Sequence, residues 1–291
     1  MKINTKTATT AQIHQYLLSA VAPRPIALVS TIDKEGNVNL SPFSFFNVFS
    51  ANPPIAIFSP ARRVRDNTTK HTLENVLEHP ECVIHLVSYD MVEQMSLSST
   101  EYDKGINEFT KSGFTQITSD SVKPPRVLEA PVAFECNVLE IKPLGDQGGA
   151  GNLVICEILQ IHIEDSILDV DGKIDTLKID LVSRYGGNWY GRTLSEALFE
   201  IPKPIHSTGI GIDQLPEHIK NSSILTGNNL ARLANVEKLP SEEEVNNFLI
   251  NHPDLKAKNR IKIHKLAKEL IEKNEIEQAL YTLLIKLNIN G

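Results

Sequence analysis

Two segments of the chain carry side chains that could bind a charged aromatic ligand. The first, residues 41–54, mixes hydroxyl and amide side chains with phenylalanines and ends at two prolines. This mixture suits a flat ring with a polar edge, because such a ring needs apolar surface and a few hydrogen-bond donors aimed at its heteroatoms. Taken alone, however, the segment favours an ordinary strand whose phenylalanines fill the core.

The second segment, residues 62–72, is a loop rich in basic and hydroxyl side chains in an otherwise acidic chain. It leads into a predicted helix near Leu73, and the free N–H groups and dipole at a helix N-terminus favour an anion. Arginine and lysine side chains would complete a phosphate cradle through charge-assisted hydrogen bonds. The residues 62–72 alone fit a solvated surface turn as well as they fit a phosphate-binding loop.

A third segment, residues 184–191, contains the only tryptophan of the chain and places glycines beside aromatic residues. Glycine lets the backbone approach a flat ligand closely, although a buried aromatic corner with a Gly-rich turn explains the segment nearly as well. The glycine-rich stretch at residues 145–151 lacks the G-x-G-x-x-G spacing and lies between predicted strands, so we interpret it as a hairpin loop.

Other chemistries lack recognisable patterns in this sequence. The nine histidines show no H-E-x-x-H spacing and no C-x-x-C accompanies them, so we predict no metal site. A G-x-S-x-G motif is absent, which leaves serine hydrolysis unsupported. The cysteines, Cys82, Cys136 and Cys156, are odd in number and lie in apolar runs, which favours buried free thiols in a reducing compartment.

Charge and composition exclude several classes of protein. Hydrophobic residues make up 41% of the chain and charged residues 22%, as in an ordinary globular protein. The net charge of −7 disfavours nucleic-acid and anionic-membrane binding, since both require positive charge near phosphates. No secretory signal is recognisable, and no run of about 18 apolar residues occurs. We therefore expect a cytoplasmic protein that binds neither nucleic acid nor membranes.

Short strands are expected to position these segments between residues 25 and 181. Runs rich in β-branched and other apolar residues predict strands at residues 25–32, 55–58, 82–87, 132–141 and 153–163, with shorter pieces near Ile167 and Ile179 around a turn at Asp171-Gly172. A hairpin loop is predicted at residues 33–37, and short helices at residues 72–78, 91–97 and 101–111. Many short strands with few helices favour a barrel or sandwich over a doubly wound sheet.

Helical periodicity takes over near the C-terminus, and we place the domain boundary between residues 193 and 194. The connector is marked by prolines and glycines at Pro202, Pro204, Gly209 and Gly211. A capping box at Ser241 and Glu244 begins one helix, and Pro253 begins another. Apolar stripes up to Leu287 predict a helical hairpin. It could bind a partner or form a dimer, but an amphipathic pair packed on the barrel is the simpler interpretation.

Four segments, taken together and in order, resemble one family. They are APRPIALVST at residues 22–31, the segment at residues 41–54, KHTLEN at residues 70–75, and RYGG at residues 184–187. This combination is similar to the flavin reductase-like, FMN-binding split β-barrel family, in its flavoredoxin-like branch. The resemblance covers about residues 15–192 and leaves the C-terminal helical extension outside it.

The resemblance implies a mainly β fold, a six-stranded FMN-binding split β-barrel with short peripheral helices, followed here by a C-terminal α-helical extension. It also implies a homodimer with FMN at or near the subunit interface. Carried over residue by residue, the cofactor-binding set is Ser41, Pro42, Ser44, Phe45, Phe46 and Asn47 for the ring, and Arg62, Lys70 and Thr72 for the phosphate.

This chain departs from the family pattern at two histidines. His71 stands where members usually carry an aspartate, so its role is left open. His85 stands where the strand often carries asparagine, and it either faces the flavin or fills a core site.

The resemblance leads us to expect NAD(P)H-dependent reduction of flavin, with electrons passed to a downstream acceptor. We assign no catalytic residue, because hydride arrives at the flavin ring and the protein has only to position two flat molecules and exclude water. With no dinucleotide fold in view, NADH or NADPH and the acceptor would use one cleft in turn, which predicts ping-pong kinetics. The alternatives are a non-enzymatic FMN electron-transfer protein that works with a redox protein partner, and a barrel that has lost its flavin.

Overall fold

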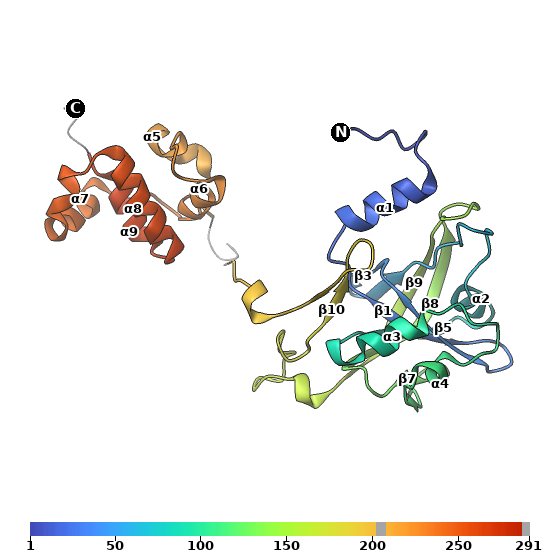
Figure 1. Cartoon of the computed structure of the whole chain (residues 1–291). Coiled ribbons are helices and arrows are strands. Elements are labelled where there is room, and N and C mark those ends of the chain that lie inside the picture. Colours follow the sequence, from blue (N-terminus) through green and yellow to red (C-terminus); the bar gives the residue numbers. More distant parts are fainter. Residues whose placement is uncertain (202–207, 287–291) are drawn as a thin grey trace. The chain divides into compact units, whose positions relative to one another are not determined.

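The chain folds into two units, one built mainly of strands and one helical (Figure 1). The computed structural model describes residues 1–201 and 208–286, so Pro202, Pro204 and Leu287 lie outside the described residues. Contacts divide the chain into Met1–Phe199 and Glu200–Gly291, whereas the sequence placed the boundary at residues 193 and 194. A mainly β unit followed by C-terminal helices is confirmed.

Seven strands form the main sheet of the first unit, in the order β2-β1-β5-β8-β9-β4-β3, with every neighbouring pair antiparallel. They are β1 (Ala27–Ile32), β2 (Val38–Phe43), β3 (Phe46–Ala51), β4 (Pro54–Phe58), β5 (Glu81–Leu86), β8 (Val132–Pro143) and β9 (Asn152–Ile163). Two small ribbons pair β6 (Gln116–Ile117) with β7 (Arg126–Val127), and β10 (Val182–Arg184) with β11 (Tyr190–Arg192). The predicted main strands and the first hairpin loop are confirmed.

The sheet curls because its two edge strands are consecutive in the chain. β2 ends at Phe43 and β3 begins at Phe46, so only Ser44 and Phe45 join the two edges. Three Cα–Cα steps reach at most about 11 Å, which brings the edges together at this end of a barrel. The resemblance implied six strands; the seventh arises because residues 38–51 break at this bend, and the two halves pair with β1 and β4.

β1 is buried on both faces, which explains its continuous apolar run. Ala27 and Val29 belong to the core inside the barrel, together with all three cysteines, which are free and buried as predicted. Leu28 packs on the outer side, in a second core with Met95 and Phe109. β1 is therefore a rigid support between the barrel interior and the outer helices.

Three short helices pack on β1 and β2: α2 (His71–Glu78), α3 (Val92–Ser98) and α4 (Glu108–Ser112). The first two were predicted, but the helix expected at residues 101–111 is wrong over its first half. Gly105 there has a φ of +87°, which breaks a helix, and Asn107 caps α4 by accepting from the N–H of Phe109.

An N-terminal helix, α1 (Thr10–Ala20), was not predicted. None of its residues is buried, although Ile13, Tyr16, Leu17 and Ala20 follow the i, i+3, i+4, i+7 spacing of a helical stripe. A further local signal is the capping box that Thr9 forms with Gln12.

The second unit contains α5 (Glu217–Lys220), α6 (Gly227–Leu233), α7 (Glu242–Asn251), α8 (Arg260–Glu272) and α9 (Ile276–Leu284). The capping box of Ser241 with Glu244 is confirmed at α7. The helix start predicted at Pro253 is wrong: a 3-10 turn lies there, and α8 begins at Arg260 after its cap Asn259.

The predicted helical hairpin is formed by α8 and α9. Its apolar stripe, including Ile263, Ile271 and Leu280, is buried against Leu215 and Leu233 of the same unit. The stripe therefore has partners within its own unit and does not require the barrel as a surface to pack on. Within the described residues, no helix has the length and apolar character needed to cross a membrane.

Candidate functional site

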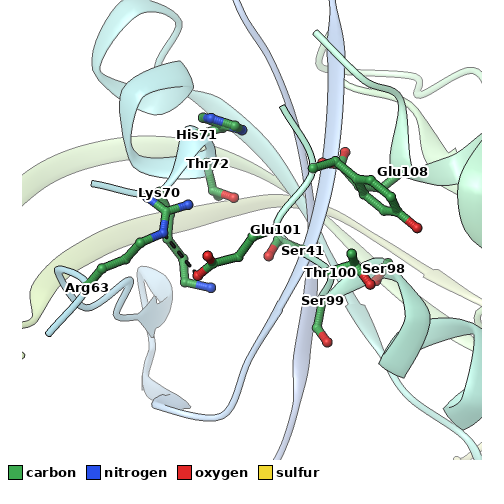
Figure 2. Close-up of a pocket in the computed structure, with 11 residues that line it drawn as sticks. Ser41, Arg63, Lys70, His71, Thr72, Ser98, Ser99, Thr100, Glu101 and Glu108 are labelled. Atoms are coloured by element: carbon green, nitrogen blue, oxygen red, sulfur yellow. Dashed lines mark hydrogen bonds and ion pairs between the residues drawn. The ribbon is translucent and has the colours of Figure 1, made fainter. Parts of the chain in front are cut away.

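An open pocket lies beside the N-terminus of α2 (Figure 2). Its walls come from β2, the loop before α2, the first turn of α2, the end of α3 with the turn that follows, and α4. The lining residues are Ser41, Arg63, Lys70, His71, Thr72, Ser98, Ser99, Thr100, Glu101, Tyr102 and Glu108. Of the residues predicted from the sequence, the structure brings Ser41, Lys70 and Thr72 together here.

Arg62 gives the loop before α2 its shape. Its guanidinium donates from Nε to Oδ1 of Asn67 (2.7 Å) and from Nη2 to the Asn67 carbonyl (2.6 Å). Asn67 has a φ of 58°, a conformation that asparagine adopts more readily than most residues. The backbone of Arg62 also bonds Gly149 and Ala150 in the β8–β9 hairpin loop. The structure therefore places Arg62 outside the pocket, where it shapes the loop.

The arginine that lines the pocket is its neighbour, Arg63. It donates to the Thr68 hydroxyl (3.0 Å) and to the Thr69 carbonyl, and its Nε lies 3.1 Å from Oε1 of Glu101. Arg65 reaches the other oxygen of Glu101 at 2.8 Å. Hydrogen bonds from Arg65 and Arg63 hold the pKa of Glu101 below its usual range. Glu101 thus neutralises part of the positive charge of the loop before α2.

Lys70 is the second cation of the pocket, and it is half-buried. Burial lowers its pKa, and the charge of Arg63 lowers it further. Its Nζ lies 5.7 Å from the centre of the Phe43 ring. Across residues 1–201 and 208–286 it forms no ion pair; the charge of Glu101, which is paired with the two arginines, raises the Lys70 pKa by less than the other two effects lower it. A desolvated cation beside another cation is stabilised by a bound anion.

The first turn of α2 adds hydrogen-bond donors to the two cations. No side chain caps this helix in the described structure, so its first N–H groups and its dipole are available to an anion. Thr72 is buried, and its hydroxyl oxygen accepts from Nδ2 of Asn39 at 2.9 Å. That bond fixes the Thr72 side chain and leaves its hydroxyl proton free for a ligand. The arrangement suits a phosphate group.

The predicted ring-binding residues start in this pocket and continue away from it. Ser41 lines the pocket, and Pro42, also on β2, is half-buried. Ser44, at the bend, accepts from Nε of Arg24 at 3.4 Å. Arg24 itself is buried and also donates to backbone carbonyls, including those of Val21 (2.6 Å) and Tyr185 (3.0 Å). It therefore ties α1 and the β10–β11 ribbon to the bend.

The remaining members of the predicted set lie outside the pocket. Phe45 is 40% exposed and meets the His14 ring edge to face, with centroids 6.5 Å apart. Phe46 packs against the core inside the barrel, which agrees with the strand interpretation for this residue. Asn47 is exposed on the edge strand β3.

His85 fills a core site, which decides between its two predicted roles. Its Nδ1 donates to the Leu28 carbonyl (2.8 Å), and its Nε2 accepts from the Val127 N–H (2.9 Å). Burial lowers the pKa of His85 to about 4. The side chain is therefore a neutral link between β5, β1 and β7. His71, in contrast, lines the pocket at the start of α2.

The glycine and aromatic segment at residues 184–191 forms the turn of the β10–β11 ribbon. Trp189 is 78% exposed, so the buried aromatic corner is wrong for this residue. Arg184 lies over the Tyr190 ring, 4.5 Å from its centroid. Gly186 presses against Ser19 of α1, where an added Cβ would come within 2.3 Å of the serine hydroxyl. Gly186 therefore allows the ribbon to pack closely against α1, where a larger residue would clash.

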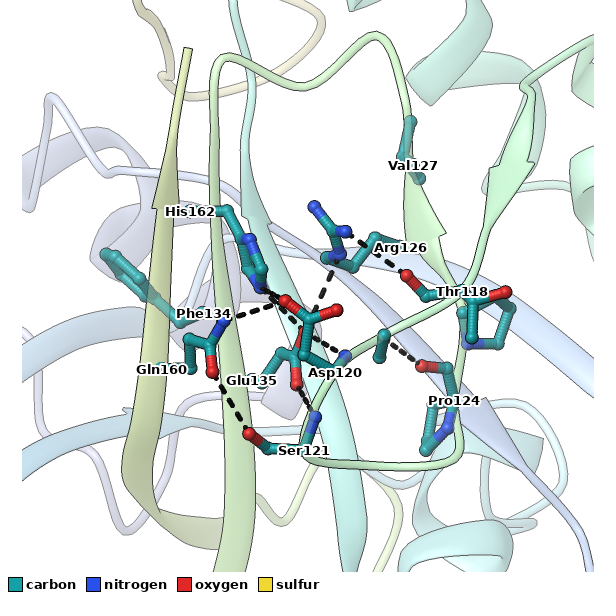
Figure 3. A network of polar contacts seen from close by, with 12 residues as sticks. Thr118, Asp120, Ser121, Pro124, Arg126, Val127, Phe134, Glu135, Gln160 and His162 are labelled. Carbon is teal, nitrogen blue, oxygen red and sulfur yellow. Dashed lines mark hydrogen bonds and ion pairs between the residues drawn. The ribbon is translucent and has the colours of Figure 1, made fainter.

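Asp120, Glu135 and His162 come close enough together to be considered as a metal-binding group (Figure 3). Glu135 is fully buried, and its carboxylate accepts from the N–H groups of Asp120 (2.8 Å) and Ser121 (2.5 Å) and from Nε2 of His162 (2.7 Å). Arg126 lies 3.6 Å away from it. These hydrogen bonds give the three residues a structural role without a metal ion: they hold the loop at residues 118–127 against the barrel.

Sequence reasoning missed several pocket residues for identifiable reasons. Adjacent arginines at positions 62 and 63 give no basis for choosing between them, because loop geometry decides. Glu101 and Glu108 reach the pocket from segments distant in sequence. Glu108 is buried, accepts from the Leu40 N–H at 2.9 Å, and has a pKa raised by burial.

Comparison with known proteins agrees with this fold. The chain matches the flavin reductase like domain over residues 19–178. An uncharacterized protein of Aquifex aeolicus is 39% identical over 189 residues, which cover 65% of this chain and 94% of that protein.

Solved structures with a similar fold cover about the same share of the chain. Nitrilotriacetate monooxygenase component B from Bacillus cereus has a TM-score of 0.65 at 28% identity and covers 69% of this chain and 98% of that one. The 2-nitrobenzoate 2-nitroreductase NbaA of Pseudomonas fluorescens has a TM-score of 0.61 at 27% identity, covering 72% and 100%. Flavin reductases and flavoredoxins are among the other neighbours. The chain therefore belongs to the flavin reductase-like, FMN-binding split-barrel family.

Proposed function

We propose that this protein is an FMN-dependent oxidoreductase that takes reducing equivalents from NADH or NADPH and passes them to a downstream acceptor. Membership of the flavin reductase-like family supports the cofactor class. The observation that carries the proposal is the pocket at the start of α2. Lys70 and Arg63 stand there beside a helix N-terminus without a side-chain cap, in a chain whose net charge is −7.

The residues of the pocket fit the phosphate of FMN. Lys70 offers a cation that has no acidic partner among the described residues, and Arg63 offers a second cation. The Thr72 hydroxyl and the first N–H groups of α2 would complete the set of donors. Ser41 lies on β2, which leads to the bend, where the ring would meet Ser44 and the exposed residues Phe45 and Asn47.

When bound, FMN supplies hydride acceptance and electron release at its ring. The protein then has to hold the phosphate, orient the ring and keep water from the face where hydride arrives. The geometry offers no dinucleotide-binding fold in the described residues, so donor and acceptor would occupy one cleft in turn. This is the physical basis for the ping-pong scheme, and it leaves the choice between NADH and NADPH to measurement.

A homodimer forms part of the proposal, because the barrel exposes large apolar side chains on the edge strand β3 and on β9. Large apolar side chains that are 39% to 65% exposed on β3 and β9 are Val48, Phe49, Leu159, Ile161 and Ile163. We take these side chains as one apolar surface, which is unusual on a monomer unless something covers it. A second copy would cover it and enclose the exposed predicted residues Phe45 and Asn47.

Sedimentation of the purified protein tests the dimer. The wild type is expected to sediment as a dimer, and Ile161→Glu should shift it toward the monomer because a charge would enter an apolar interface. Leu177→Glu is the matched control, since Leu177 is similarly exposed, at 49%, and belongs to neither β3 nor β9. A monomeric wild type would show that the apolar surface has another use.

Flavin content and reduction kinetics test the activity. Purified protein should show the visible absorbance of bound flavin, and heat should release FMN. Under anaerobic stopped flow, NADH or NADPH should bleach this absorbance rapidly, and steady-state reciprocal plots should be parallel. Intersecting plots would contradict the shared cleft. Slow reduction by both nicotinamides, with fast reduction by a reduced redox protein, would instead support the electron-transfer alternative.

A protein that stays colourless when FMN is added would contradict the proposal as a whole. In that case the barrel would have lost its flavin, and the C-terminal helices would have to supply the function.

A further inference from the structure

The helical unit contains a pocket of its own, which the flavin chemistry does not use. Its volume of about 460 Å³ lies within the range of small-molecule sites. The walls are α5, the turn after it and the first turns of α8. The lining residues are Glu217, His218, Asn221, Ser222, Ser223, Ile224, Arg260, Ile261 and His264.

Hydrogen bonds fix which nitrogen of His264 carries the proton. Ser222 Oγ accepts from the N–H groups of Ile224 and Leu225, both at 3.1 Å. Its own hydroxyl proton is therefore free to be donated to Nδ1 of His264, which lies 2.6 Å away. Burial lowers the pKa of His264, so the ring is neutral near pH 7. With Nδ1 accepting, Nε2 must carry the proton.

The Nε2–H of His264 is a donor without an acceptor. The residue is only 4% exposed, and this nitrogen has no hydrogen-bond partner among the described residues. Among the described residues, only Arg126 Nε and Thr282 Oγ1 are side-chain polar atoms that are both fully buried and without a hydrogen-bond partner. His264 Nε2 is not one of them. Nε2 therefore reaches open space, and for a side chain that lines this pocket the open space is the pocket.

Charge on the pocket walls favours an anion. Arg260 has no acidic partner in the part of the chain that the structure describes. The one acid on the wall, Glu217, is already engaged by Lys220 Nζ at 2.6 Å and by Asn221 Nδ2 at 2.9 Å. His218 donates from Nε2 to the Leu283 carbonyl (3.0 Å), so the Nδ1 of a neutral His218 ring is an acceptor and the N–H donor of the pocket is that of His264. A guanidinium and an imidazole N–H thus face the same space without an anion between them.

Part of the wall is apolar. Ile224 and Ile261 both line the pocket, and Ile261 is 56% exposed. An inorganic ion would leave this surface in contact with water, whereas a ligand with a short hydrocarbon part would cover it.

We propose that the helical unit binds a small organic anion, with its carboxylate or phosphate between His264 and Arg260 and its apolar part against Ile224 and Ile261. The unit is thereby a ligand-binding module attached to the flavin-binding barrel. This site is formed by residues 217–264 alone, so it does not depend on the flavin site.

Calorimetric titration of the full chain tests this proposal with two kinds of probe. Acetate, butyrate and hexanoate test the carboxylate source, and inorganic phosphate tests the phosphate source. At least one probe should bind saturably, and in the carboxylate series the affinity should rise about fourfold for each CH₂ that the isoleucines cover.

Arg260→Gln is the decisive variant, because Arg260 is exposed and its loss should not affect folding. It should weaken binding about tenfold or more, since a charge-assisted hydrogen bond is lost. Lys262→Gln is the matched control: this exposed lysine lies on the same helix but does not line the pocket, and the variant should bind as the wild type does.

The proposal is overturned if none of the four probes binds saturably, or if Arg260→Gln binds its probe as tightly as the wild type. Binding of phosphate at the barrel pocket would be insensitive to Arg260, so failure here is distinguishable from failure of the flavin proposal. Equal affinities for acetate and hexanoate would contradict the proposed contact of the ligand's apolar part with Ile224 and Ile261.

Discussion

Acid should destabilise the barrel through His85, and His85→Asn should remove that effect. The imidazole is fully buried and neutral, donating to the Leu28 carbonyl and accepting from the Val127 N–H. Protonation would place a second N–H where Nε2 now accepts and would bury a charge. Asparagine keeps one donor and one acceptor on the side chain without titrating in this range.

The size of the effect follows from the two pKa values of His85. Its folded pKa of about 4 lies below 6.5, the ordinary pKa of a histidine side chain, which applies in the unfolded chain. The unfolded state thus binds the proton more readily, so the stabilisation is fully present above pH 6.5 and is lost as the pH falls toward 4. The linkage relation gives a loss of about 1 kcal/mol at pH 6, about 2 kcal/mol at pH 5 and about 3 kcal/mol at pH 4.

Urea unfolding at pH 7, 6 and 5, followed by far-ultraviolet circular dichroism, measures this loss. Other titrating groups affect both proteins, so the difference between wild type and His85→Asn isolates the imidazole. Between pH 7 and pH 5, the free energy of unfolding of the wild type should fall by about 2 kcal/mol more than that of His85→Asn. A constant difference across this range would show that His85 is not a buried neutral link.

Two further predictions concern buried and pocket carboxylates. Glu135→Gln should lower the free energy of unfolding by about 2 to 3 kcal/mol, because a fully buried acceptor loses its charge-assisted bonds to Asp120, Ser121 and His162. Urea unfolding measures this loss, and an unchanged midpoint would contradict the anchoring role. Glu101→Gln should tighten FMN binding several-fold, because the cationic loop loses its internal anion; fluorescence titration measures the affinity, and weaker binding would contradict this account of the pocket.

Local sequence signals predicted the elements whose cause is local. The strand at residues 25–32 is recognisable from a continuous apolar run because both of its faces are buried. The helix at Ser241 is recognisable from its capping box. α1 was missed although Thr9 and Gln12 form a capping box and Ile13, Tyr16 and Leu17 have helical spacing; none of its residues is buried. The helix predicted at residues 101–111 is interrupted at Gly105, whose φ is positive. A glycine can adopt a positive φ but need not, so the sequence alone did not show the interruption.

The site was predictable only in part, because its geometry depends on contacts distant in sequence. The basic loop and the helix N-terminus could be located from residue types, and Lys70 and Thr72 followed. Which of Arg62 and Arg63 lines the pocket depends on the turn at Asn67, whose amide engages Arg62. Glu101 joins the loop across a sequence distance of 38 residues, for which no local pattern exists.

The second unit shows the same division between local and distant causes. The stripe of α8 and α9 predicted a hairpin correctly, but it could not show that α5, α6 and α7 would cover it. The donor that this unit offers in its pocket depends on the tautomer of His264, which the hydroxyl of Ser222 sets from 42 residues away.

The most direct test of the central claim compares the affinities of FMN and riboflavin, which differ by the phosphate. Wild-type protein should bind FMN at least tenfold more tightly than riboflavin, and Lys70→Met should remove most of that advantage while riboflavin binding changes little. Lys34→Met, an exposed lysine outside the pocket, is the matched control. Equal binding of the two flavins by the wild type, or a preference for FMN that survives in Lys70→Met, would contradict the assignment of the α2 pocket to the phosphate.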